Sequence, residues 1–231
     1  HWLETNRVML RNRRIGSSLA GLTKFLTLHG LDELAHWCDE GYKTIEDYDK
    51  VYSDWMVTQN SIKTTSIKPG GSVPKLPGEI SGMHFPTGEY LIRRMRLGIN
   101  SPLVQPLKDA GYKIEPAYGS EDTTLVVGFP IKTGEGIRTE EQVSMWEQLS
   151  FAAFLQEHWA DNQVSCTIKF DPETEGDQIK HALNYFQYKL KGISFLPRTK
   201  DVYKQIPEEP ITKEKYEEMV SILKSIDFTQ I

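Results

Sequence analysis

The second half of the chain alternates between β-prone and helix-prone segments, and this alternation limits the fold more than any other feature. Residues 123–130 and 163–170 have the β-branched character of buried strands, and an amphipathic segment over 139–161 separates them. A helix over 176–190 and a short strand over 193–196 follow. Because strands joined by helices usually pair in parallel, we expect an α/β fold with a parallel sheet.

Local signals predict where further elements begin and end. We expect helices over 5–30, 44–60, 102–110 and 212–225, and the apolar residues of 44–60 recur at helical spacing. Thr44 and Thr212 are expected N-caps, Thr139 opens a capping box with Gln142, and Gly111 closes a helix.

Two other segments are read as β-prone or left open. Residues 64–68 form a short β-prone run, while 90–97 (YLIRRMRL) fit either a strand or a helix. Pro197, Pro207 and Pro210 space out a linker. We expect one domain over 1–196 and a C-terminal extension with a final helix over 197–231.

Composition narrows the class of protein. The 231 residues are 39% hydrophobic and 26% charged, which is enough apolar material for a packed core. A net charge of −5 argues against a general nucleic-acid binder but allows a local positive pocket. Two distant cysteines make no disulfide framework, and no apolar run is long enough to span a bilayer. We therefore expect a cytoplasmic protein, or one in the host cytoplasm if it is viral, without a membrane partner.

The start of the chain has the texture of a helix interior. The chain does not begin with Met, and we do not expect its first residues to form a signal peptide, since no small-residue cleavage site follows an apolar core. We expect a fragment, a processed piece or a chain whose earlier part is not included.

The segment TTSIKPGGSV, residues 64–73, carries the strongest chemical signal. A strand that ends in consecutive glycines and a hydroxyl residue exposes several main-chain N–H groups in one concavity, and Lys68 adds a positive charge. This pattern predicts a phosphate-binding loop. An ordinary tight turn is the alternative, since Pro-Gly-Gly makes such turns often.

Four separated motifs place the loop in a wider pattern. NRRIGSSLAGL (12–22), TTSIKPGGSV (64–73), SGMHFPTGEYLIRRMRL (81–97) and WEQLSFAAFLQEHWADNQVSCTIKFDP (146–172) follow in this order, and PITKEKYEEMVSILKSIDF closes the series. Nearly the whole chain resembles the C-terminal half of the adenosylcobalamin-dependent ribonucleoside-triphosphate reductases, the monomeric class II ribonucleotide reductases. The resemblance implies the second half-barrel of a ten-stranded α/β barrel, and the conversion of ribonucleotides to 2′-deoxyribonucleotides by thiyl-radical chemistry.

The resemblance also implies a substrate site. The family's phosphate loop, usually Pro-Ser-Gly-Thr-Val or Pro-Thr-Gly-Thr-Ile, matches Pro69, Gly70, Gly71, Ser72 and Val73. Gly70 replaces a hydroxyl residue, so a contact there would have to come from the main chain. Whether the substrate is a diphosphate or a triphosphate stays open.

Adenosylcobalamin is the cofactor that the resemblance implies. One wall of its pocket would come from about 81–123, where we single out His84, Phe85 and Arg93 as contacts, and another from about 196–228. Family members are thought to hold cobalt without a protein histidine, so we expect no metal ligand here.

The resemblance leaves parts of the reaction outside this chain. The radical cysteine of the finger loop would lie before residue 1, so we expect no catalytic residue here. Cys38 and Cys166 are expected to be buried core residues. The expected partners are the ribonucleotide, a thioredoxin-type reductant and the N-terminal half of the enzyme, in the same or a separate chain.

Two other hypotheses remain at this stage. One is a non-catalytic module that binds a nucleotide or cobalamin, and the other is an unrelated metabolic α/β enzyme. A partner that carries the finger-loop cysteine would distinguish the reductase from the binding module.

Overall fold

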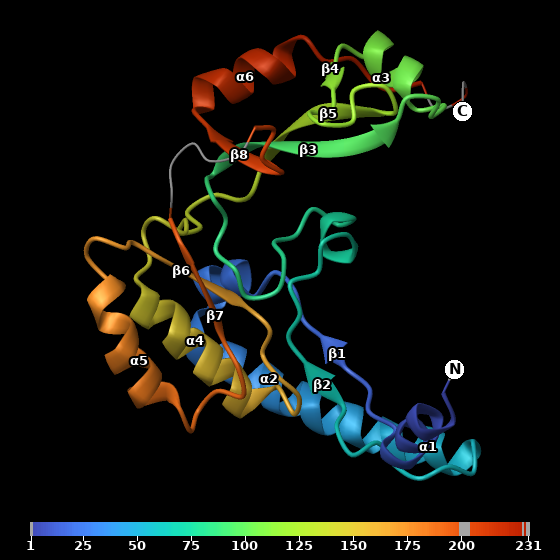
Figure 1. The fold of residues 1–231 in the computed structure, drawn as a ribbon, viewed down its shortest axis with the longest axis vertical. Coiled ribbons are helices and arrows are strands. Elements are labelled where there is room, and N and C mark those ends of the chain that lie inside the picture. The colour runs from blue at the N-terminus through green and yellow to red at the C-terminus, as the bar shows by residue number, and fades with distance from the viewer. Residues whose placement is uncertain (1, 199–203, 228, 230–231) are drawn as a thin grey trace. The chain divides into compact units, whose positions relative to one another are not determined.

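The computed structural model describes residues 2–198, 204–227 and 229. They are divided between two units (Figure 1). Unit 1 comprises His1–Phe85 and Glu140–Arg198, and unit 2 comprises Pro86–Thr139 and Thr199–Ile231. Within the described ranges, no helix combines the length and apolar character needed to cross a membrane.

The strands of unit 1 pair in parallel, as predicted. β1 (Ser17–Ser18) pairs with β2 (Thr65–Ser66), and β6 (Thr167–Phe170) pairs with β7 (Ser194–Pro197). A further parallel bridge joins the residue after β2 to the segment before β6. The three strands predicted for this unit are therefore confirmed, with shifted ends.

Helices cover these strands and supply much of the core. The helical elements of unit 1 are α1 (Leu3–Asn12), α2 (Leu22–Trp55), η1 (Val73–Lys75), α4 (Met145–His158), η2 (Gly176–Gln178) and α5 (Ile179–Phe186). Helix α4 contacts α2, α5 and β6. Its Leu149 and Leu155 are almost fully buried in one apolar cluster with Ile168 of β6.

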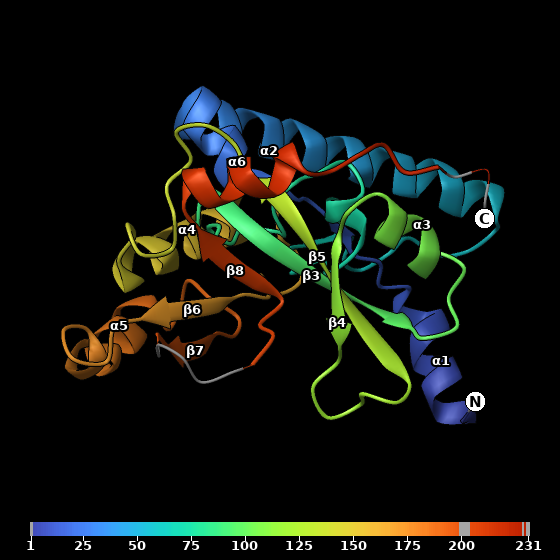
Figure 2. The same ribbon diagram turned by 90° about the horizontal axis from the view of Figure 1, so that it is seen from above.

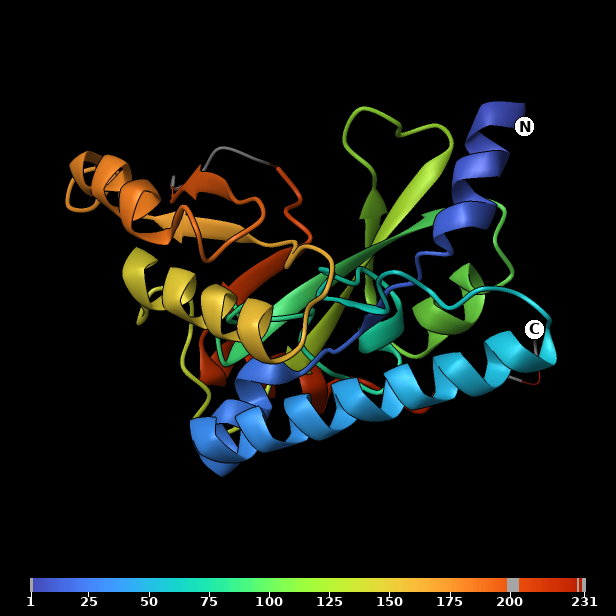
Figure 3. The ribbon, with the colours of Figure 1, turned by 90° about the horizontal axis from the view of Figure 1, so that it is seen from below.

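The single helix predicted over 5–30 is wrong, because the chain turns at Arg13. Arg13 adopts a left-handed conformation (φ 47°) and ends α1, and β1 precedes α2. The N-cap predicted at Thr44 is also wrong, since Thr44 lies inside α2 and its hydroxyl donates to the main-chain oxygen of Glu40 (2.8 Å). Gly30 (φ 83°, ψ 176°) interrupts α2, which Figure 3 shows along its length.

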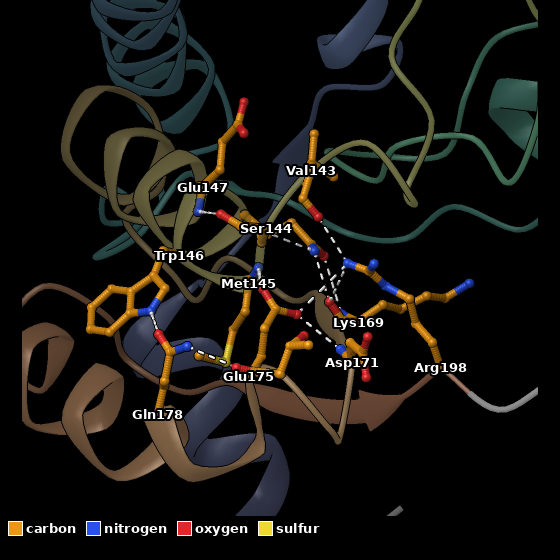
Figure 4. Close-up of polar contacts among 12 residues, drawn as sticks. Val143, Ser144, Met145, Trp146, Glu147, Lys169, Asp171, Glu175, Gln178 and Arg198 are labelled. Atoms are coloured by element: carbon orange, nitrogen blue, oxygen red, sulfur yellow. Dashed lines mark hydrogen bonds and ion pairs between the residues drawn. The ribbon is translucent and has the colours of Figure 1, made fainter.

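Helix α4 starts later than the capping box predicted at Thr139. Its N-cap is Ser144, whose Oγ accepts a hydrogen bond from the N–H of Glu147 (3.1 Å). The carboxylate of Glu175 accepts a second one from the N–H of Met145 (2.7 Å; Figure 4). A residue distant in sequence therefore helps to set the helix start, which local spacing does not reveal.

Unit 2 is built on an antiparallel sheet in the order β4-β5-β3-β8 (Figure 2). Its strands are β3 (Tyr90–Gly98), β4 (Lys113–Pro116), β5 (Thr124–Lys132) and β8 (Glu208–Ile211). The strand predicted over 123–130 is confirmed, but its expected parallel pairing is wrong. The loop between β4 and β5 is too short for a parallel crossover, so these neighbours run antiparallel.

Two short helices of unit 2 follow their local signals. The glycine after α3 (Val104–Asp109), Gly111, has a φ of 88°. Helix α6 (Lys213–Ser221) starts after Thr212, whose Oγ accepts a hydrogen bond from the N–H of Lys215 (3.3 Å). Both predicted helices are confirmed. Residues 90–97, which fitted either a strand or a helix, belong to strand β3.

The segment predicted as a proline-spaced linker contributes a strand instead. β8 joins the sheet beside β3, where Arg94 donates to the main-chain oxygen of Ile206 (2.9 Å) and pairs with Glu209. Prolines are tolerated because β8 is an edge strand. The division into 1–196 and 197–231 stays a prediction, while the overall mixed α/β class is confirmed.

Candidate functional site

The loop over 69–73 follows β2 and presents unpaired main-chain donors. The N–H of Gly70 donates to the main-chain oxygen of Lys68 (2.9 Å), so it is not available to a ligand in this conformation. Within the described part of the chain, no acceptor pairs with the next three N–H groups, those of Gly71, Ser72 and Val73. Three consecutive exposed donors beside an exposed lysine suit an oxyanion.

Gly70 is needed for local packing. A Cβ atom at this position would lie 2.8 Å from Cδ of the buried Pro74. A hydroxyl residue, as in the family's usual loop, would therefore require Pro74 to move. Gly71 differs, because a Cβ there would meet no heavy atom within 4 Å.

A turn that contains Ser81 and Gly82 packs against the main chain of the loop. The hydroxyl of Ser81 donates to the main-chain oxygen of Gly70 (2.7 Å). Gly82 (φ 54°) approaches so closely that a Cβ would lie 2.7 Å from the oxygen of Lys68. Sequence reasoning did not single out these two residues. The available signal was a Ser-Gly pair just before His84.

Both ring nitrogens of His84 contact main-chain groups. Nδ1 lies 3.3 Å from the main-chain oxygen of Ser81. Nε2 accepts a hydrogen bond from the main-chain N–H of Thr167 on β6 (3.2 Å). These partners fit the neutral tautomer that carries its proton on Nδ1. Burial lowers the pKa of His84 despite the hydrogen bond to Ser81, so the ring is neutral at pH 7. His84 thus ties the turn under the loop to β6.

The other predicted cofactor contacts lie in different surroundings. Phe85 is half-buried against the unit 1 core, with its ring centroid 6.4 Å from that of Phe151. Arg93 belongs to unit 2, where its Nε donates to Oε1 of Glu208 (3.0 Å). The structure therefore brings the loop and His84 together within unit 1 and places Arg93 in the other unit. The cofactor role of all three stays a prediction.

Neither cysteine has the character of a reactive thiol. Cys38 and Cys166 are both free and buried. Burial raises the pKa of Cys38 to about 11 and that of Cys166 to about 12, so both are protonated at neutral pH. Among the residues that the structure describes, no three His, Cys, Asp or Glu side chains gather to hold a metal ion.

The relatives of this chain share one activity in their names. A probable adenosylcobalamin-dependent ribonucleoside-triphosphate reductase of Dictyostelium discoideum is 51% identical over 100% of the chain and 31% of its own length. An adenosylcobalamin-dependent ribonucleoside-triphosphate reductase of Euglena gracilis is 51% identical over 97% of the chain and 31% of its length. That of Lactobacillus gasseri is 38% identical over 94% and 33%.

The same likeness appears in three dimensions. A crystal structure of a B12-dependent (class II) ribonucleotide reductase superposes with a TM-score of 0.87 at 35% identity, and covers 97% of this chain and 35% of that one. No family model matches the chain. The chain thus belongs to the adenosylcobalamin-dependent ribonucleoside-triphosphate reductase family, and it spans about a third of the length of the curated relatives that it matches.

Proposed function

We propose that this chain is a segment of an enzyme that reduces ribonucleotides to 2′-deoxyribonucleotides, and that its loop over 69–73 holds the substrate phosphates. The proposed phosphate binding rests on the row of unpaired main-chain N–H groups at Gly71, Ser72 and Val73. Main-chain donors bind an anion without a side chain, so the replacement of the usual hydroxyl by Gly70 leaves this capacity intact. The binding-module alternative is not favoured, because the relatives are named as reductases.

The remainder of the enzyme would complete the reaction. In this proposal the parallel strands of unit 1 form part of the second half of a ten-stranded barrel. The N-terminal part supplies the radical cysteine, because Cys38 and Cys166 are buried thiols of raised pKa. A thioredoxin-type protein returns the electrons that each reduction consumes, and we propose a cytoplasmic location.

The three residues predicted to contact the cofactor suit adenosylcobalamin only in part. Both ring nitrogens of His84 already have main-chain partners, so the residue offers no free nitrogen to cobalt. The half-buried Phe85 offers an apolar surface, and Arg93 retains donors beyond the Nε that is paired with Glu208. Bound adenosylcobalamin would supply radical initiation. The role of His84 in this proposal is to hold the loop through Ser81.

A bulky residue at position 71 tests the proposal. Because a Cβ at Gly71 meets no heavy atom, Gly71→Val should leave the fold intact while its branched side chain crowds the N–H groups. In the full-length natural protein, calorimetric affinity for a ribonucleoside triphosphate should fall at least about tenfold.

Gly98→Val is the matched control. A Cβ at Gly98 on β3 also meets no heavy atom within 4 Å, and valine suits a strand. The control should bind the nucleotide as the wild type does. Equal affinity of the Gly71→Val protein and the wild type would remove the loop from the substrate site.

A further inference from the structure

A second positively charged site lies in unit 1. A cleft of about 520 Å³ opens beside the residues that precede β2 and β6. Its charged lining consists of four cations and one carboxylate, a formal charge of +3: Arg14, Lys63, Lys68, Lys191 and Asp161. The whole chain has a formal charge of −5, so the sign of this cleft is opposite to that of the chain as a whole.

The one carboxylate is already occupied by uncharged donors. Oδ1 of Asp161 accepts from the hydroxyl of Tyr42 (2.9 Å), and Oδ2 accepts from the N–H (3.0 Å) and hydroxyl (3.1 Å) of Thr64. Within the described residues, no carboxylate lies within ion-pair distance of the four cations of the cleft. Asp161 attracts Lys63 and Lys191 without forming a direct ion pair, so it offsets the positive charge of the cleft only in part.

Two of the lysines are brought together. Burial lowers the pKa of Lys191, and the charge of the adjacent Lys63 lowers it further. The ammonium of Lys191 also donates to the main-chain oxygen of Asp161. Like charges repel at this range, and an anion placed between them would turn the repulsion into attraction.

A serine hydroxyl completes the site. The residue Ser66 is only 3% exposed, but its Oγ lines the cleft and is not among the fully buried side-chain atoms. A Cβ at Gly16 would lie 3.1 Å from this oxygen, so the absence of a side chain there keeps the hydroxyl accessible. An accessible hydroxyl can donate a hydrogen bond to an anion in the cleft.

We propose that this cleft binds a phosphate-bearing anion at a site distinct from the loop over 69–73. None of the five loop residues lines the cleft, and only the neighbouring Lys68 is common to the two sites. Four cations and a hydroxyl donor exceed what one carboxylate needs and match a di- or triphosphate group, which carries several charges and many acceptor oxygens. This inference does not depend on the proposed reduction.

The test uses the full-length natural protein and inorganic tripolyphosphate as the probe. Isothermal titration calorimetry should detect binding that weakens at least about tenfold in the Lys63→Gln/Lys191→Gln double variant. A Lys43→Gln/Lys180→Gln double variant makes the same charge change outside the cleft and should bind as the wild type does. Ser66→Ala, which removes only the hydroxyl, should weaken binding less.

Two further arms separate the possible outcomes. The single variant Lys191→Gln changes an exposed side chain, so it should keep the fold while weakening tripolyphosphate binding less than the double variant does. Gly71→Val disables the proposed substrate loop, and cleft binding should persist in it. Wild-type affinity in the Lys63→Gln/Lys191→Gln variant, or loss of all binding in Gly71→Val, would overturn the proposal. Failure of tripolyphosphate to bind, as when acidic side chains of the remaining protein fill the cleft, would also overturn it.

Discussion

Replacing Gly82 by alanine tests whether the close approach of two turns shapes the candidate phosphate loop. Gly82 has a φ of 54°, and a Cβ would lie 2.7 Å from the main-chain oxygen of Lys68. The left-handed conformation costs a residue with a Cβ about 1–2 kcal/mol, and forcing an extra carbon into a packed contact costs about 1–3 kcal/mol more. We therefore expect Gly82→Ala to destabilise this region by about 2–5 kcal/mol.

Gly78→Ala separates the two contributions. Gly78 also has a positive φ (80°), but a Cβ there meets no heavy atom within 4 Å. Only the conformational cost applies, about 1–2 kcal/mol. The difference between the two variants measures the contact with Lys68.

Native-state hydrogen exchange, read by mass spectrometry on peptides that cover residues 64–85, is the assay. A loss of 2 kcal/mol corresponds to about 30-fold faster exchange for amides that open with this region. The amides to follow include that of His84, which bonds to Ser81. Equal effects of Gly82→Ala and Gly78→Ala would refute the argument that a close main-chain approach holds the loop.

Three further predictions concern His84, Arg94 and Glu175. Burial lowers the pKa of folded His84 below its usual value of about 6.5, so the unfolded chain binds more protons, and the stability from neutral His84 is present above that pH and lost as the pH falls toward the folded pKa. Denaturant unfolding across this range should show a steeper acid loss in wild type than in His84→Gln, and identical slopes would contradict the assignment. Arg94→Gln removes the partly exposed pair with Glu209 and should speed amide exchange in β8 by an amount equal to about 1–2 kcal/mol. Unchanged exchange there would mean that the main-chain ladder alone holds β8. Glu175→Ala should cost about 1–2 kcal/mol in unfolding free energy, because the N–H of Met145 loses its acceptor. A loss no larger than that of an exposed Glu→Ala change would rule out this cap.

The sequence alone determined those features whose causes lie within a few residues. Thr212 caps α6 because its hydroxyl reaches a nearby N–H, and Gly111 follows α3 because only glycine adopts its φ freely. The run of β-branched residues in β5 predicted a strand because strand preference also depends on neighbouring residues. The ordered motifs, taken together, were specific enough to predict the family, and one of them contains the candidate phosphate loop.

Only the tertiary structure decided the features whose causes are distant in sequence. The start of α4 depends on Glu175, and the linker segment became β8 because β3 offered a free edge. The role of His84 was hidden because its partner Thr167 lies on β6, 83 residues further along the chain. The cleft cations gather from three separate stretches of chain. Spacing along a chain predicts local hydrogen bonds and amphipathic faces, but long-range partners are chosen by packing, which the folded molecule alone specifies.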